Sequence, residues 1–322
     1  MKKTRTKLLA LALVLAALFS LPACAKKPEG PLSKTAAYLQ AQVKEPACGA
    51  LGGDWLVFGL ARSGEDVSQK YLDTYYKNVV NYVEERNGVL SERKYTEYSR
   101  LILALTAIGK DPRDVAGYDL LTPLADFDET VSQGLNGAIF ALLAFDSGNY
   151  DIPENLDAST QATREAYLDE ILRREIETGG WALTGGEPDA DMTAMALQAL
   201  AKYRKDPDVS AAVERGISAL SKMQEPNGAY LSWGEENSES LSQVIVALTE
   251  LGISLDDARF VKNGQTLQAA LERFSCENGA YRHTLSGEPD EMATEQAFYA
   301  LAAIHRAEAG LSTLYDMTDV MQ

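Results

Sequence analysis

An internal repeat constrains the fold of this chain more than any other feature of its sequence. Five times, a glycine-bearing turn leads through a short aromatic or polar segment into an alanine-rich apolar stretch. The clearest copies begin at Gly179 (GGWALTGGEPDADMTAMALQAL), Asn227 (NGAYLSWGEENSESLSQVIVAL) and Asn278 (NGAYRHTLSGEPDEMATEQAFYAL), and looser copies begin at Asn87 and Gly134. Because such units bury their apolar faces against one another, the repeat predicts a repeating architecture before any single residue is considered.

Helical patterns of two alternating kinds account for most of the chain, and strand patterns are nearly absent. A helix that is apolar on most sides is buried on most sides, so the alternation predicts an all-α fold of six hairpins, with apolar helices inside and amphipathic helices outside. Stacked hairpins of this kind form either a closed ring or an open superhelix. The amphipathic segments are 33–45, 68–86, 112–124, 160–176, 207–224 and 262–275, and the apolar segments are 53–63, 95–108, 134–145, 191–203, 239–251 and 291–307.

Residues at the expected helix boundaries agree with these segments. Asp191, Ser240 and Asp290 are predicted N-caps, since their side-chain oxygens can accept hydrogen bonds from free backbone amides. Pro112 and Pro207 stand where two outer helices are expected to begin, and a missing amide costs nothing at that position.

The N-terminus is typical of a bacterial lipoprotein signal peptide over residues 1–24. A basic segment precedes an apolar core from Leu8 to Phe19, and a small residue stands before Cys24. The apolar run is too short and too early to favour a membrane-spanning helix. We therefore expect acylation of Cys24, a polar tether over 25–33, and an extracytoplasmic protein anchored to the bacterial cell membrane. An ordinary secreted protein is the alternative.

The charge of the chain argues against some partners. The formal net charge is −17, and removal of the four basic residues of the signal peptide would make it −21. Such a surface repels phosphate groups, so we expect no nucleic acid and no anionic lipid headgroup as partner. Solubility outside the cell is the simpler explanation of the charge.

The repeat resembles the prenyltransferase and squalene-oxidase repeat of the terpenoid cyclase/protein prenyltransferase α/α-toroid superfamily. The segments ETGGW, QEPNGAY and CENGAY are similar to its glycine–aromatic turn motif, and bacterial exported proteins that carry this repeat are the nearest group. The resemblance covers roughly residues 50–320. It implies that the six hairpins, within residues 34–322, close into an (α/α)6 toroid with inner and outer helix rings.

The same resemblance raises the question of catalysis. Class II terpene cyclases protonate an isoprenoid with the central acid of a D-x-D-D-T-A motif, and the matching residues here are Asp189, Asp191 and Met192. Asp191 would be the general acid with Asp189 beside it, but Met192 replaces the last carboxylate. Helix capping is the alternative role of both aspartates. Toroids also carry glycoside hydrolases with paired carboxylates, for which the candidates are Glu97, Asp189, Asp191, Glu291 and Glu295.

The residues that other reactions of this fold require are missing from the sequence. Cys276, His283 and His305 stand in no recognisable zinc-ligand spacing, so we expect no metal. The thioester motif Cys-Gly-Glu-Gln is replaced by Cys-Gly-Ala-Leu from Cys48. The segment DMTAMAL is similar to an inner-helix motif of the transcobalamin and intrinsic factor α-domain, so a corrinoid remains an alternative cofactor. A partner domain would be required, because no β-domain of that kind is seen in the sequence.

Ring closure would place Cys48 and Cys276 in neighbouring turns at one end of the toroid. Disulfides form in exported proteins, so we expect a Cys48–Cys276 bond that locks the ring.

The mouth formed by the inner-helix N-termini is the expected ligand site, since helix dipoles converge there. We expect it to take a bulky, partly apolar small molecule, a glycan or a cell-envelope protein. A non-catalytic binding or interaction module is the first hypothesis, and an isoprenoid cyclase or transferase with Asp191 as acid is the second. The mouth residues are Trp55, Tyr98, Arg100, Asn136, Trp181, Tyr230, Trp233, Glu239, Gln243, Tyr281, His283 and Gln296.

Overall fold

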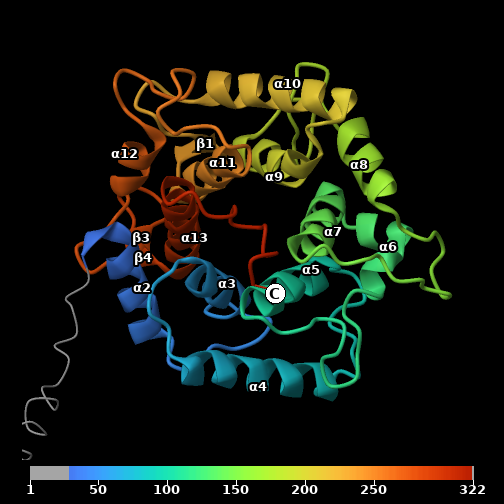
Figure 1. The fold of residues 1–322 in the computed structure, drawn as a ribbon. Coiled ribbons are helices and arrows are strands. Elements are labelled where there is room, and N and C mark those ends of the chain that lie inside the picture. The colour runs from blue at the N-terminus through green and yellow to red at the C-terminus, as the bar shows by residue number, and fades with distance from the viewer. Residues whose placement is uncertain (1–28, 321–322) are drawn as a thin grey trace, which may run out of the picture. The chain divides into compact units, whose positions relative to one another are not determined.

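Six apolar helices form a closed inner ring in the computed structural model, which describes residues 29–320 (Figure 1). Each helix packs on the next inner helix in the chain, and the last packs on the first. The ring lies in one compact unit that begins at Pro31. The expected all-α toroid is confirmed. The inner helices are α3 (Asp54–Arg62), α5 (Thr96–Ala107), α7 (Leu135–Ser147), α9 (Ala190–Leu200, continued by η2, Ala201–Tyr203), α11 (Ser238–Glu250) and α13 (Glu291–Glu308).

The outer ring is less regular than the sequence pattern suggests. The expected helix over 112–124 is absent, because Ala116 and Gly117 adopt positive φ angles of 55° and 83° and the side chains of Asp111 and Asp114 bond nearby backbone amides. The segment 262–275 shortens for a similar reason, since Asn263 has φ 50°. The outer elements are α2 (Gly30–Gln42), α4 (Gln69–Glu85), η1 (Pro123–Ala125), α6 (Phe127–Val131), α8 (Arg164–Arg173), α10 (Pro207–Met223) and α12 (Leu267–Glu272).

The N-caps of the inner helices correct two of the three predictions. Asp290 caps α13 by accepting a hydrogen bond from Ala293 N at 2.8 Å, as expected. Asp189, not Asp191, caps α9, and Asn237, not Ser240, caps α11. Asp191 and Ser240 therefore lie within the first turn of their helices, where their side chains are free of the capping role.

The glycine–aromatic turns join the outer ring to the inner ring. Gly179 and Gly228 have φ angles of 88° and 85°, which favour glycine and let the chain reverse. The aromatic side chain that follows is fully buried: Trp181 Nε1 donates to Ile171 O of α8 at 2.7 Å, and Tyr230 OH donates to Leu220 O of α10. In these two copies the turn aromatic therefore binds the outer helix to the start of the inner helix that follows it.

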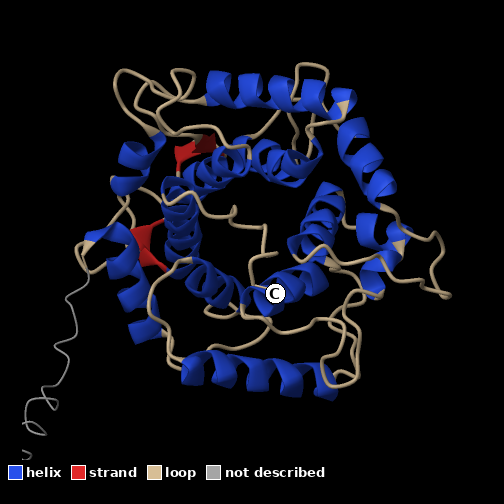
Figure 2. Ribbon diagram, viewed as in Figure 1, coloured by secondary structure: helices blue, strands red, loops and turns tan. Residues whose placement is uncertain are grey.

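Two short β-hairpins precede the last two inner helices (Figure 2). Strand β1 (Leu231–Ser232) pairs with β2 (Glu235–Glu236), and β3 (Tyr281–Arg282) pairs with β4 (Pro289–Asp290), both antiparallel. They extend the turns that lead into α11 and α13.

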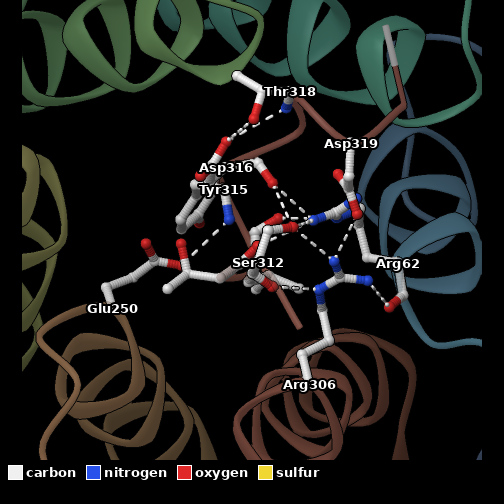
Figure 3. Close-up of polar contacts among 10 residues, drawn as sticks. Arg62, Glu250, Arg306, Ser312, Tyr315, Asp316, Thr318 and Asp319 are labelled. Carbon is white, nitrogen blue, oxygen red and sulfur yellow. Dashed lines mark hydrogen bonds and ion pairs between the residues drawn. The ribbon is translucent and has the colours of Figure 1, made fainter. Parts of the chain in front are cut away.

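A tail segment, residues 310–320, lies inside the ring at the C-terminal ends of the inner helices (Figures 1 and 3). Arg62 of α3, only 1% exposed, holds it by donating to the carbonyl oxygens of Thr313, Leu314 and Asp316 and to the carboxylate of Asp319. The tail therefore covers this end of the lumen, where a cavity of about 280 Å³ remains between it and α7, α9 and α11.

A second arginine and two further helices complete the closure. Arg306 of α13 donates to Ser312 O at 2.7 Å and to Asp319 Oδ2 at 2.8 Å. On other sides of the ring, Met317 N donates to the carbonyl of Ser147 in α7, and Tyr315 N donates to Glu250 of α11.

The predicted signal peptide over 1–24, with the acylation expected at Cys24, lies outside the described residues. α2 begins at Gly30, within the expected tether. Across residues 29–320, no helix combines the length and the apolar character that crossing a membrane requires.

Candidate functional site

A cavity of about 370 Å³ lies in the lumen, on the side of the inner-helix N-termini. Its walls come from all six inner helices, and Tyr315 of the tail segment contributes to it from the closed end. Leu51 and Met292, which are about half exposed, line it at the open end. The remaining lining residues are Gly49, Ala50, Trp55, Arg100, Phe140, Met195, Gln243, Glu295, Gln296 and Tyr299.

Aromatic rings dominate the apolar part of this wall. The ring centroid of Trp55 lies 5.9 Å from that of Phe140 and 6.0 Å from that of Tyr299, in edge-on and tilted arrangements. Tyr315 stacks on Phe58 of α3 with centroids 5.4 Å apart. These contacts fix the orientation of the rings, because aromatic pairs prefer such geometries.

A hydrogen-bonded network of amides joins the neighbouring helices α9, α11 and α13 on one side of the lumen. Gln198 of α9 donates to Gln243 of α11 at 3.0 Å, and Gln243 donates in turn to Gln296 of α13 at 3.1 Å. Tyr299 OH donates to the same Gln296 oxygen at 3.0 Å and accepts from Gln243. Such a network supplies fixed donors and acceptors for the polar part of a ligand.

The carboxylate of Glu295 is the buried acid of this cavity. The residue is 3% exposed, and its Oε1 accepts a hydrogen bond from Gly52 N at 2.7 Å. Burial, with a smaller contribution from the neighbouring Glu291 carboxylate, raises the pKa of Glu295 to about 7.

The single cation among the described lining residues, Arg100, is already paired. Its Nε donates to Asp54 Oδ2 at 2.8 Å, and its Nη2 donates to Glu97. Asp54 is almost wholly buried and also accepts hydrogen bonds from Tyr75 OH at 2.6 Å and from Gly49 N. Arg100 therefore balances two carboxylates and leaves no free positive charge for a ligand.

A second cavity, of about 530 Å³, adjoins the first at Met195. It lies over the N-terminus of α9, with Asp189, Asp191 and Trp233 in its wall. Burial raises the pKa of the Asp191 carboxyl, and its buried Oδ1 has no hydrogen-bond partner among the described residues. Asn136 Oδ1, in the same wall, also lacks one.

Asp189 is engaged structurally on both oxygens. Its Oδ1 accepts from Met192 N at 2.7 Å and its Oδ2 accepts from Leu183 N at 2.9 Å. It thus caps α9 and holds the preceding turn, whereas the resemblance gave it a place in an acid pair.

The structure brings together most, but not all, of the predicted mouth residues. Trp55, Arg100, Gln243 and Gln296 line the first cavity, Asn136 and Trp233 line the second, and Glu239 pairs with His283 Nδ1 at 2.8 Å beside them. The other four aromatic residues are packed in the fold: Trp181, Tyr230 and Tyr281 are fully buried, and Tyr98 is 3% exposed with its hydroxyl bonded by Leu90 N.

The prediction missed three of the four rings that line the first cavity, namely Phe140, Tyr299 and Tyr315. Phe140 and Tyr299 stand in inner helices that are apolar on nearly all sides, so helical period alone does not separate the lumen-facing side from the side between the rings. No periodic signal places the tail segment, because it is not helical.

The expected Cys48–Cys276 disulfide is wrong, since both thiols are free. Cys48 is buried beside Asp54, in the turn that packs on Tyr82 of α4. The turn of Cys276 packs instead on α2, where Gly279 lies against the backbone of Lys34. The two turns therefore face different outer helices. No group of three or more metal-ligating side chains is assembled within residues 29–320.

Comparisons with known proteins show the fold of this chain. No protein-family model matches the sequence, and no curated protein matches it. Among solved structures, Candida albicans protein geranylgeranyltransferase-I complexed with GGPP is similar at 12% identity and a TM-score of 0.60, over 90% of this chain and 99% of that one.

Two further structures agree. The unsaturated glucuronyl hydrolase of Bacillus sp. GL1 has a TM-score of 0.59 at 14% identity, over 89% of this chain and 97% of that one. A protein from Actinoplanes has a TM-score of 0.54 at 13% identity, over 87% and 100%. At such identities the likeness establishes the architecture and no activity. The chain is an α/α toroid.

Proposed function

We propose that this protein is a non-catalytic binding module whose luminal cavity takes a bulky, partly apolar small molecule. The observation that carries the proposal is the cavity itself: aromatic rings and an amide network line about 370 Å³ that is closed by the tail segment and reached from the mouth. Small-molecule sites have this composition, a largely apolar wall with a few fixed polar groups.

The charges of the cavity argue against the ligand types of the named neighbours. One neighbour was solved with GGPP, and another is a glucuronyl hydrolase. Diphosphates and glucuronyl groups are anionic and need a cationic group at the site. Arg100 is neutralised by Asp54 and Glu97, so neither ligand type is favoured here.

The absence of catalysis is proposed from the state of the motif residues. Asp189 is occupied by two backbone amides, and the next position after Asp191 is Met192. Asp191 thus lacks the partner carboxylate that would tune it as a strong acid.

The cellular setting remains a proposal from the sequence. Residues 1–24 favour an exported lipoprotein attached through Cys24, related to bacterial exported proteins that carry this repeat. The toroid would then be displayed outside the membrane, where the ligand or a cell-envelope partner is met.

Mass spectrometry of a released ligand tests the proposal. Mature protein from a bacterial host would be purified and denatured, and the expected result is one small molecule in stoichiometric amount. A Met195→Trp variant, which adds bulk where the two cavities meet, should lose it. The control is Leu156→Trp at a position that is 89% exposed and lines neither cavity.

If wild-type protein releases nothing and binds no small molecule from an extract of its host, the cavity is not a ligand site and the proposal fails.

A further inference from the structure

We infer that the ligand of the luminal cavity is an organic cation, an amine or quaternary ammonium, held by aromatic faces and by the carboxylate of Glu295. The inference rests on the proposed function of this cavity and names the chemical class of its ligand. Three independent features of the described residues support it: the rings, the buried carboxylate and the charge balance around them.

The rings come from four separate elements and surround one space. Trp55 of α3, Phe140 of α7, Tyr299 of α13 and Tyr315 of the tail segment all line the cavity. The face of an aromatic ring carries negative electrostatic potential and attracts a cation within about 6 Å of its centroid. Several rings around one space form the kind of cage that recognises ammonium groups.

Glu295 supplies a negative charge at the wall of the same space. Its carboxylate accepts a hydrogen bond from Gly52 N, and no lysine, arginine or histidine among residues 29–320 forms an ion pair with it. A buried carboxylate without a counter-charge is costly, and a bound cation would relieve that cost. Burial raises the pKa of this group, and the neighbouring carboxylates raise it further.

The surroundings of Glu295 add further negative charge. Glu291 and Asp54 act on it from α13 and α3, and Arg100 of α5, which opposes them, is shared between Asp54 and Glu97. Across the lumen, Asp191 of α9 and Glu239 of α11 act on the hydroxyl of Tyr299. A cation that enters from the mouth therefore lies close to more carboxylates than cationic side chains.

A matched pair of probes tests the charge of the ligand directly. Acetylcholine and its uncharged carbon isostere, 3,3-dimethylbutyl acetate, have nearly the same shape and differ in one positive charge. Binding to ligand-free full-length protein would be measured by calorimetry at pH 8, where Glu295 is ionised. We expect acetylcholine to bind at least tenfold more tightly than the isostere.

Two variants assign the preference to the cavity. Glu295→Gln keeps the shape and the acceptor for Gly52 N, and it should reduce the preference to below threefold by weakening acetylcholine alone. Glu288→Gln removes the same charge from an exposed site on the neighbouring hairpin and should leave the preference intact. Equal loss in both variants would overturn the role of Glu295, since it would indicate diffuse attraction to the acidic surface.

The remaining outcomes separate this inference from the proposed function. Equal binding of the two probes, or release of a neutral molecule from purified protein, overturns the cation and leaves the cavity as a ligand site. Failure of both probes overturns the cation as well. The proposed function is also overturned only if neither probe binds and the purified protein releases no small molecule in the mass spectrometric test.

Discussion

The two ends of the lumen are built from the same inner helices but in opposite ways. At the C-terminal ends, the guanidinium of Arg62 has five hydrogen bonds to the tail segment and is 1% exposed. At the N-terminal ends, large apolar side chains are exposed to solvent: Leu183 is 61% exposed and Trp233 is 95% exposed.

This difference indicates a division of labour within one ring. The closed end uses a buried arginine with a full set of hydrogen bonds to the tail, which fixes a single arrangement because a missing partner is costly. The open end leaves buried polar atoms such as Asn136 Oδ1 without a partner and keeps exposed apolar surface. Unsatisfied groups and exposed apolar surface mark places where another molecule binds.

The largest effect is expected at the closed end. Arg62→Ala removes the donor to three tail carbonyls and one of the two arginines that pair with Asp319, and we expect it to cost about 3–5 kcal/mol of unfolding free energy. Denaturant unfolding of the folded variant measures it. The control is Arg113→Ala, which breaks an exposed ion pair with Asp111 and should cost below about 1 kcal/mol. Equal costs for the two arginines would mean that the tail is not anchored as described.

Two tryptophans on the mouth side should respond differently to substitution, because one is buried and the other is exposed to solvent. Trp181→Ala should cost about 3–4 kcal/mol, because it opens a cavity and frees the carbonyl of Ile171. Trp233→Ala, at a side chain exposed to water, should change stability by under about 0.5 kcal/mol. Thermal and denaturant unfolding of both variants provide the measurement, and a large cost at Trp233 would contradict its exposed position.

The stability of the protein is expected to depend on pH through one glutamate at each end. Burial raises the pKa values of Glu250, at the closed end, and Glu295, at the open end, from 4.5 to about 7. Between these values the folded state holds a proton that the unfolded state releases, so unfolding free energy falls as pH rises from about 4.5 to about 7. Each group contributes on the order of 3 kcal/mol to that fall.

Glutamine variants separate the two contributions. Glu250→Gln and Glu295→Gln should each be more stable than the wild type at pH 8 and flatten part of the slope, which unfolding at pH 5 and pH 8 would show. For Glu295 a bound cation should cancel the effect, whereas Glu250 should not respond to it. A wild-type stability that is constant between pH 5 and pH 7 would refute the pKa shifts.

The smallest effect is expected for the rim of the mouth. Leu183→Ser removes an exposed apolar side chain, so stability should change by less than about 0.5 kcal/mol. Binding to the luminal cavity should also persist, because Leu183 does not line it. Unfolding and ligand release together test this, and loss of the ligand would extend the site to the second cavity.

The inner ring of helices was more predictable from the sequence than the outer ring. All six inner helices follow from their largely apolar character, because packing on most sides favours apolar residues. The outer segment at 112–124 does not, since aspartate side chains and a positive φ at Ala116 override its helical pattern. Local hydrogen bonding therefore determines the structure of this segment, which the hydrophobic period alone predicts incorrectly.

The site was predictable in location but not in composition. The mouth was expected from the helix N-termini, and Trp55, Gln243 and Gln296 do line the cavity. Trp181 and Tyr230 were misplaced because an aromatic residue after a glycine turn packs equally well toward an outer helix. Tyr315 was beyond reach, since its position depends on hydrogen bonds between residues some 250 positions apart.

That separation has a consequence for the making of the protein. The guanidinium of Arg62 meets carbonyl groups that are synthesised 252 positions later, which at typical translation rates is roughly 10–50 s. Throughout that interval the growing chain is an arc whose first inner helix has no neighbour on one side, and its apolar flank is exposed. Assembly is therefore completed only near the end of synthesis, and every earlier intermediate is a substrate for chaperones and proteases rather than a smaller version of the finished ring.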